Sequence, residues 1–121
     1  MMRKDTSPIC VQSKTFALHM VGLYRLLSEE KKEFVLSKQV LRSGTSIGAN
    51  VHEAVQAQSR ADFLSKLSIA LKEAFETEYW LEILMESSYV SQKKGTELMS
   101  ELKSLLRMLT SSIKTAKANA S

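Results

Sequence analysis

The stretch that decides the fold is RADFLSKLSIALKEAFETEYWLEILMES, which runs from Arg60 to Ser87. Its apolar and small residues recur at alternating intervals of four and three: Phe63, Leu67, Ala70, Ala74, Thr77, Leu81 and Leu84. This is the heptad spacing of a helix in an antiparallel bundle. A second stripe lies on another side of the same helix: Ile69, Glu76, Trp80 and Ile83. A helix at the edge of a monomer needs only one buried face, so the extra face indicates a subunit interface.

Three further segments show helical periodicity, and short breaks separate them. The predicted helices span residues 9–28, 37–58, 60–87 and 95–117. Ser7 and Pro8 form a start signal, with a capping hydroxyl before a proline at the first helical position. Residues 29–33 are polar and predict a solvated loop, while Ser59 and Asp62 resemble a capping box. One all-α domain, an antiparallel up-and-down four-helix bundle, is the predicted fold.

The helix predicted over residues 37–58 is rich in small residues. Gly44 and Gly48 lie inside it, and each internal glycine weakens a helix by about 1 kcal/mol relative to alanine. Close approach of another backbone would offset that cost, so we expect a tight helix contact at these positions.

Composition narrows the class of protein further. The chain has 4 Gly and 1 Pro, too few for the many turns of an all-β fold. Cys10 is the lone cysteine, which fits a reducing cytoplasm. We expect no signal peptide and no membrane span, because no stretch approaches about 18 uninterrupted apolar residues.

Charge is distributed unevenly along a chain whose formal net charge is +4. Residues 61–92 are acidic, whereas the two terminal helices are basic. Their cations are candidates for phosphate contacts with a nucleic acid. They are Lys14, Arg25, Lys93, Lys94, Lys103, Arg107, Lys114 and Lys117. The opposing interpretation is an ordinary solvated helix face.

No catalytic or metal-binding pattern is present in the sequence. His19 and His52 fall in different predicted helices, without the Glu-x-x-His pairs of di-iron bundles. Residues 42–48 superficially suggest a phosphate loop, but they lack its Gly-Lys-Ser/Thr ending and a preceding strand. We therefore expect no enzyme activity, no metal and no cofactor.

Three carboxylates leave two interpretations open. Glu53, Glu73 and Glu76 are either buried or interfacial, or they are plain surface charges. A buried carboxylate needs a partner, and Arg42 is the best candidate, within the chain or across a subunit boundary.

Two long motifs resemble a known family. One is VLRSGTSIGANVHEA, residues 40–54, and the other combines Asp62-Phe63, Lys66, residues 69–74, Glu76-Thr77 and residues 79–81. Together they closely resemble the bacterial four-helix-bundle proteins encoded in intervening sequences of 23S ribosomal RNA, which are sometimes labelled a ribosomal protein. The resemblance covers essentially the whole chain.

The resemblance implies a ring-like homopentamer with no established enzymatic activity. It also implies kinship with the accessory protein of diversity-generating retroelements, a basic bundle that binds RNA and reverse transcriptase. Motif positions carried over as candidates for oligomer contact are Arg42, Ser43, Gly44, Thr45, Gly48, Asn50, Glu53, Glu73 and Trp80. Small residues suit tight helix contacts better than they suit RNA binding, so we expect these positions to be structural.

Two functional hypotheses follow from the sequence. The first is a cytoplasmic homo-oligomer that binds RNA or an RNA–protein complex; the resemblance implies that it is a pentamer and adds reverse transcriptase as a candidate partner. The alternative is a protein–protein adaptor with no nucleic-acid role, which would use the apolar second face of the helix over residues 60–87.

Overall fold

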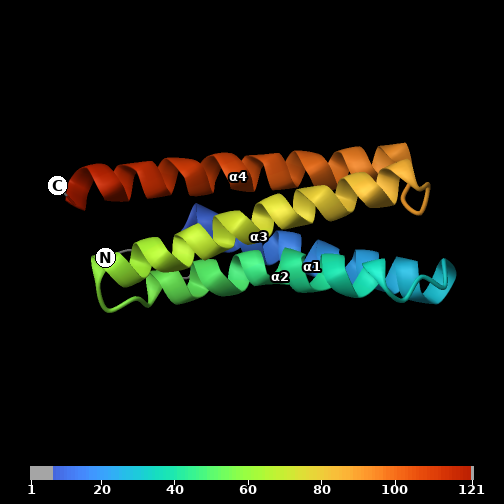
Figure 1. Cartoon of the computed structure of the whole chain (residues 1–121), viewed down its shortest axis with the longest axis horizontal. Coiled ribbons are helices and arrows are strands. Elements are labelled where there is room, and N and C mark those ends of the chain that lie inside the picture. The colour runs from blue at the N-terminus through green and yellow to red at the C-terminus, as the bar shows by residue number, and fades with distance from the viewer. Residues whose placement is uncertain (1–6, 121) are drawn as a thin grey trace.

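Four α-helices running alternately up and down make up the computed structural model, which describes residues 7–120 (Figure 1). The helices are α1 (Pro8–Arg25), α2 (Leu36–Val55), α3 (Arg60–Glu86) and α4 (Gln92–Ala120). A π-helical turn, η2 (Leu26–Glu30), extends α1. No strand occurs in this range. The predicted all-α four-helix bundle is confirmed.

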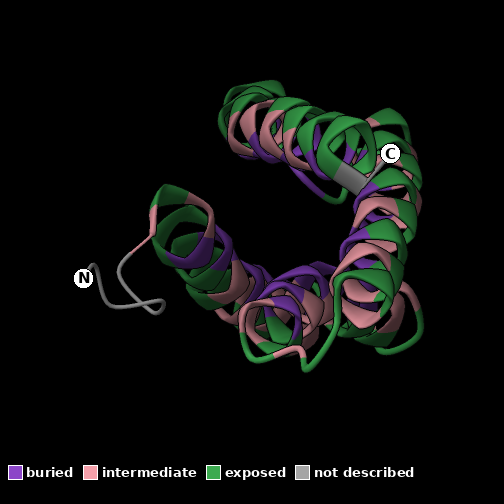
Figure 2. Cartoon of the chain, turned by 90° about the vertical axis from the view of Figure 1, so that its left-hand side faces the viewer, coloured by how far each residue is buried: buried purple, intermediate pink, exposed green. Residues whose placement is uncertain are grey.

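Buried residues line the inner side of the four helices, which form an arc in the end-on view of Figure 2. The predicted seam of α3 faces this interior: Phe63 is partly buried and its other six residues are buried. Phe16 and Met20 from α1 and Ile47 from α2 fill the same core. α1 and α4 lie at the two ends of the arc, and they contact each other less than the pairs α1–α2, α2–α3 and α3–α4 do.

The start of α1 differs in one detail from the prediction. The helix begins at Pro8, with Ser7 in an extended conformation before it. The hydroxyl of Ser7 makes no capping hydrogen bond and has no partner in the described part of the chain. The proline ring therefore marks this start, because its fixed φ suits the first helical turn.

The segment predicted to be a loop at residues 29–33 is partly helical. The chain continues past Arg25 in a π-helical turn, in which the Lys31 amide donates to the Leu26 carbonyl at 3.2 Å. Leu27 is buried in this turn. The wider turn keeps Leu27 in the core, and Lys32 then ends the helix with a φ of 54°.

Other helix boundaries also differ from the prediction, including the end of α4, which lies at Ala120 instead of residue 117. α2 ends at Val55, three residues before its predicted end, because residues 56–58 turn the chain toward the extended cap residue Ser59. The Ser59 hydroxyl accepts a hydrogen bond from the Asp62 amide at 3.1 Å, as a capping box requires. α4 begins at Gln92 instead of residue 95, because the Ser91 hydroxyl caps the Lys94 amide at 3.1 Å.

The carboxylate of Glu33 caps the start of α2. It accepts hydrogen bonds from the backbone amides of Ser37, at 2.7 Å, and Val35, at 3.2 Å. Burial alone would raise the pKa of Glu33, but the backbone N–H groups of Leu36, Ser37 and Val35 outweigh it and lower that pKa from its ordinary 4.5.

Glu33→Gln should destabilise the chain at pH 7 by up to about 1 kcal/mol, the usual contribution of a helix cap. Because the folded-state pKa of Glu33 is lowered, its contribution is present above pH 4.5 and disappears as the pH falls through the folded value. Urea unfolding should therefore show a larger difference between wild type and Glu33→Gln at pH 7 than at pH 3. Glu30→Gln, an exposed change in the same segment, is the control.

Candidate nucleic-acid interface and the motif that supports it

Arg42 joins α2 to α3 through two carboxylates. Its guanidinium lies 3.2 Å from Glu73 Oε2 and also pairs with Glu76. The indole N–H of Trp80 donates to the same Glu76 carboxylate at 2.9 Å. The expected ion pair of Arg42 is therefore present within one chain. Glu53 does not share it, and pairs instead with Lys66 of α3 at 3.7 Å.

The residue after Arg42 forms a buried polar contact with α3. The hydroxyls of Ser43 and Thr77 lie 2.9 Å apart, and both side chains are buried. The Thr77 hydroxyl also lies 2.8 Å from the Glu73 carbonyl, which satisfies its hydrogen-bonding capacity.

The two glycines of α2 face the other neighbour, α1. A Cβ atom at Gly48 would lie 3.1 Å from the backbone carbonyl oxygen of Ser13, so the expected close backbone approach is confirmed there. At Gly44 the space is taken by a side chain instead: a Cβ atom would lie 2.7 Å from Met20 Sδ.

The remaining polar residues of the motif bind their own helix. Thr45 Oγ1 donates to the Leu41 carbonyl at 2.7 Å, and Asn50 Nδ2 donates to the Ser46 carbonyl at 2.8 Å. The motif of residues 42–53 thus holds α2 between α1 and α3, and the contacts described all lie within one chain.

The basic residues of α4 are exposed. Arg107 and Lys114 line a shallow groove of about 440 Å³ along this helix. Lys117 lies in the last turn, whereas Lys93 and Lys94 lie in the first turn at the opposite end. Lys103 differs from these five, because its ammonium group lies 2.6 Å from Glu78 of α3.

The basic residues of α1 lie on another side of the bundle. Lys14 lines a shallow pocket of about 280 Å³ together with Thr45, Gly48 and His52 of α2. The side of α4 that meets α1 carries Glu101, which pairs with His19 at 2.7 Å. The structure therefore does not combine the cations of α1 and α4 into one surface within a single chain.

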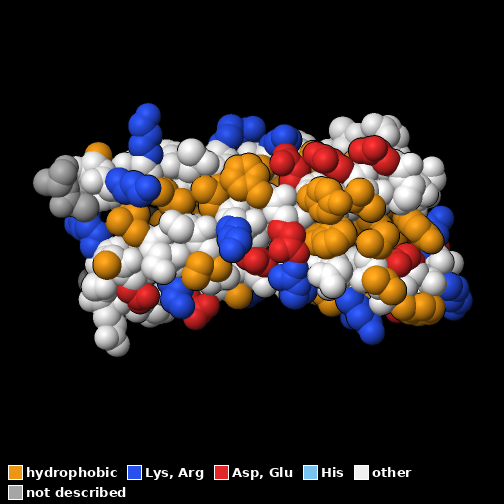
Figure 3. All heavy atoms as spheres, viewed as in Figure 1, with side chains coloured by type: hydrophobic (Ala, Val, Ile, Leu, Met, Phe, Trp, Pro, Cys, Tyr) orange, Lys and Arg blue, Asp and Glu red, His pale blue; other side chains and the backbone are white. Residues whose placement is uncertain are grey.

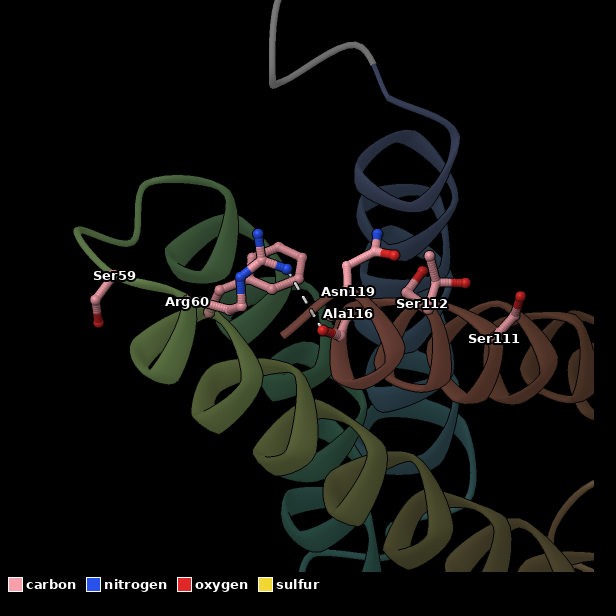
Figure 4. Close-up of a pocket in the computed structure, with 8 residues that line it drawn as sticks. Ser59, Arg60, Ser111, Ser112, Ala116 and Asn119 are labelled. Atoms are coloured by element: carbon pink, nitrogen blue, oxygen red, sulfur yellow. Dashed lines mark hydrogen bonds between the residues drawn. The ribbon is translucent and has the colours of Figure 1, made fainter. Parts of the chain in front are cut away.

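The largest pocket described, about 590 Å³, lies between the start of α3 and the end of α4 (Figure 4). Arg60 reaches across it, and its guanidinium donates to the Ala116 carbonyl at 3.5 Å. The other polar groups on its wall are hydroxyls and one amide, from Ser59, Ser111, Ser112, Thr115 and Asn119. None of the described lining residues is a carboxylate, a histidine or a cysteine, so this wall offers no general base or thiol nucleophile.

Residues 7–120 contain no group of three or more His, Cys, Asp or Glu side chains that could hold a metal ion. Within the same range, no helix combines the length and apolar character needed to cross a lipid bilayer.

A further surface was missed at the sequence level. Phe75 and Tyr79 of α3 are exposed, and the Tyr79 ring packs edge-on against Trp80 at a centroid distance of 5.2 Å. Figure 3 shows hydrophobic side chains gathered along the middle of one face, with Asp and Glu side chains on both sides of them. The sequence does contain a sign of this surface, because Phe75 and Tyr79 are four residues apart and fall on the side of the helix away from the seam. The stripe through Trp80 was taken as the second apolar face instead.

The fold and the motif contacts define an all-α bundle with exposed cations along α4 and no catalytic constellation among the described residues. The chain belongs to the 23S rRNA-intervening sequence protein family, whose model matches residues 6–111.

A solved structure supports this assignment. A protein with unknown function from the S23 ribosomal protein family of Bacteroides thetaiotaomicron VPI-5482 is 53% identical to this chain, with a TM-score of 0.87. The alignment covers 88% of this chain and 98% of that one. No curated protein matches the sequence.

Proposed function

We propose that this chain assembles with copies of itself, as a homopentamer, and binds RNA or an RNA–protein complex in the cytoplasm without catalysing a reaction. The observation that carries the proposal is the basic row Arg107, Lys114 and Lys117 on α4. These side chains are exposed, and none has an ion-pair partner among the described residues. Unpaired cations along one helix can neutralise successive phosphates and release their counterions.

Assembly increases what a short basic row can achieve. A single chain presents the cations of α1 and α4 on different sides, which limits its contact with one polyanion. A ring presents several copies of each row at once, which raises the effective concentration of cations along a bound strand. The number five comes from the family resemblance, as does a reverse transcriptase as a further partner.

RNA affinity should fall steeply with salt. We expect the anisotropy of a fluorescent RNA hairpin to report weaker binding as salt rises from about 50 to 200 mM. A triple variant, Arg107→Gln/Lys114→Gln/Lys117→Gln, should flatten the plot of log affinity against log salt by about 2 for each chain in contact with the RNA, because each phosphate contact contributes about 0.7–0.9 to its slope.

The matched control removes the same charge elsewhere. Lys31→Gln/Lys32→Gln/Lys38→Gln changes three exposed lysines around the start of α2. If this control flattens the salt dependence as much as the α4 variant does, only net charge matters and the basic row is not the site. An affinity that does not depend on salt would contradict phosphate contacts altogether.

The exposed apolar face of α3 favours a second candidate, a protein–protein adaptor. Large exposed aromatic side chains are typical of protein contacts. An RNA hairpin whose anisotropy stays unchanged at about 50 mM salt, even at high chain concentration, would favour the adaptor.

A further inference from the structure

We propose that copies of this chain join head to tail, with the outer face of α1 on one copy packed against the outer face of α3 on the next. This inference rests on the self-assembly proposed above and names the two surfaces that perform it. The α1 face consists of Val11, Lys14, Leu18, Gly22 and Arg25. The α3 face consists of Phe75, Tyr79, Glu82 and Glu86.

Both faces expose apolar side chains that the chain itself leaves uncovered. Leu18 is 64% exposed and Val11 is 50% exposed, although both lie on a helix with its own buried stripe. On α3, Phe75 is 54% exposed and Tyr79 is 55% exposed. Apolar side chains at regular helical spacing on an outer face are typical of a surface that packs against another helix.

The charges of the two faces are complementary at the end where Arg25 and Glu82 lie. Arg25 follows Leu18 on α1, and Glu82 and Glu86 follow the aromatic residues of α3, whereas at the other end both faces carry a lysine, Lys14 and Lys72. Opposite charges beside an apolar contact fix its register and suppress the pairing of like faces. Two α1 faces would repel each other, as would two α3 faces, so the complementary contact joins α1 to α3.

The two faces also match in height along the bundle. Ser43 of α2 contacts Thr77 of α3, and a Cβ on the adjacent Gly44 would contact Met20 of α1. Met20 and Thr77 therefore lie at about the same level. Since α1 and α3 run in the same direction, counting along both helices from this pair aligns the two faces residue by residue (Figure 1).

The aligned positions are complementary in character. Leu18 falls level with Phe75, and Arg25 falls level with Glu82. Gly22 falls level with Tyr79, and the Cβ position of Gly22 has no atom within 4 Å, which leaves room for an aromatic ring. Along the bundle the two faces therefore offer three contacts in turn. The apolar pair of Leu18 and Phe75 comes first, the Tyr79 ring over Gly22 comes next, and the opposite charges of Arg25 and Glu82 come last.

A closed ring whose axis is parallel to the bundle requires that the α1 face and the α3 face lie at the same level along the bundle. A rotation about an axis parallel to the bundle preserves the level of every residue, so each α1 face meets the α3 face of its neighbour in this register. A contact between two different faces is heterologous, and it closes into a ring when the rotation divides the circle.

Two face-blocking variants test the proposal. The double variant Leu18→Glu/Arg25→Glu places two carboxylates on the α1 face. The double variant Phe75→Glu/Tyr79→Glu places two on the α3 face. In each case the added negative charges should prevent that face from packing against a neighbour. Each variant alone should sediment as a single chain of 13.6 kDa, with unchanged helical circular dichroism. An equal mixture should form a one-to-one dimer and nothing larger, because one intact pair of faces remains.

A charge exchange provides the complementary test. Arg25→Glu alone should weaken assembly, and Arg25→Glu/Glu82→Arg in the same chain should restore it. Phe34→Glu is the matched control, because Phe34 is an exposed aromatic residue in the connection before α2. It should leave the assembled mass unchanged.

The outcomes separate this inference from the proposed function. A wild-type chain that stays at the mass of one chain at every concentration would contradict self-assembly itself. A wild-type oligomer whose mass survives both blocking variants would contradict these two faces and leave self-assembly and RNA binding standing. Disruption by the α1 variant alone, with no dimer in the mixture, would show a contact between like faces and overturn the inference.

Discussion

Phe16→Ala is expected to lower the free energy of unfolding by about 3–5 kcal/mol, the range observed when a buried phenylalanine is truncated. Phe16 has no exposed surface and lies in the core formed by all four helices. A chain of this size has a total stability of about 5–15 kcal/mol, so the loss is a large fraction of it. Urea unfolding followed by circular dichroism at 222 nm measures the effect.

Phe34→Ala is the matched control for this experiment. Phe34 is 55% exposed, so the same truncation there should change the free energy of unfolding by no more than about 0.5 kcal/mol. All variants should be compared at one chain concentration, since assembly adds to apparent stability. Equal losses at Phe16 and Phe34 would contradict the position of α1 in the bundle.

Gly44→Ala should also destabilise the chain, by about 1–3 kcal/mol, the usual cost of overpacking a core. This direction is opposite to the usual effect, because alanine normally favours a helix over glycine by about 1 kcal/mol. The added methyl group would overlap the side chain of Met20, which is fully buried, so the surrounding core must shift to accommodate it. Thermal and urea unfolding measure the loss.

A double-mutant cycle identifies the cause. In a Met20→Ala background the obstruction is gone, so Gly44→Ala should become neutral or stabilising. Gly22→Ala is the control, because a Cβ at Gly22 meets nothing within 4 Å, and it should stabilise α1 by about 0.5–1 kcal/mol. Comparison in chains that also carry Phe75→Glu and Tyr79→Glu removes assembly from this measurement. If Met20→Ala fails to relieve Gly44→Ala, a different contact occupies that space.

The sequence predicted the helices well where one periodic stripe dominates and a cap is visible. The seam from Phe63 to Leu84 is such a case, as is the cap at Ser59. Boundaries failed where tertiary packing overrides a local signal. The last helix was predicted from residue 95, whereas α4 begins at Gln92, and Gly95 inside it leaves space for the Met85 side chain. The π-helical turn depends on burying Leu27, which no local pattern reveals.

The candidate site was predictable in part. Arg42 was matched to the correct set of carboxylates, but only the structure shows that it pairs with Glu73 and Glu76 and leaves Glu53 to Lys66. Phe75 and Tyr79 were missed because α3 is apolar on several sides. Periodicity finds each side of such a helix without showing which one faces outward.

The contacts of Arg42, Ser43 and Gly48 with neighbouring helices affect how proteins of this architecture can diverge. These residues are engaged by neighbouring helices, so exchanging them disturbs the scaffold itself. Most of the cations on the outside of α4 make no contact with other helices. Their replacement would change which ligand the protein binds and leave its interior unchanged. One backbone can in this way serve different cellular roles through changes confined to its outer rows.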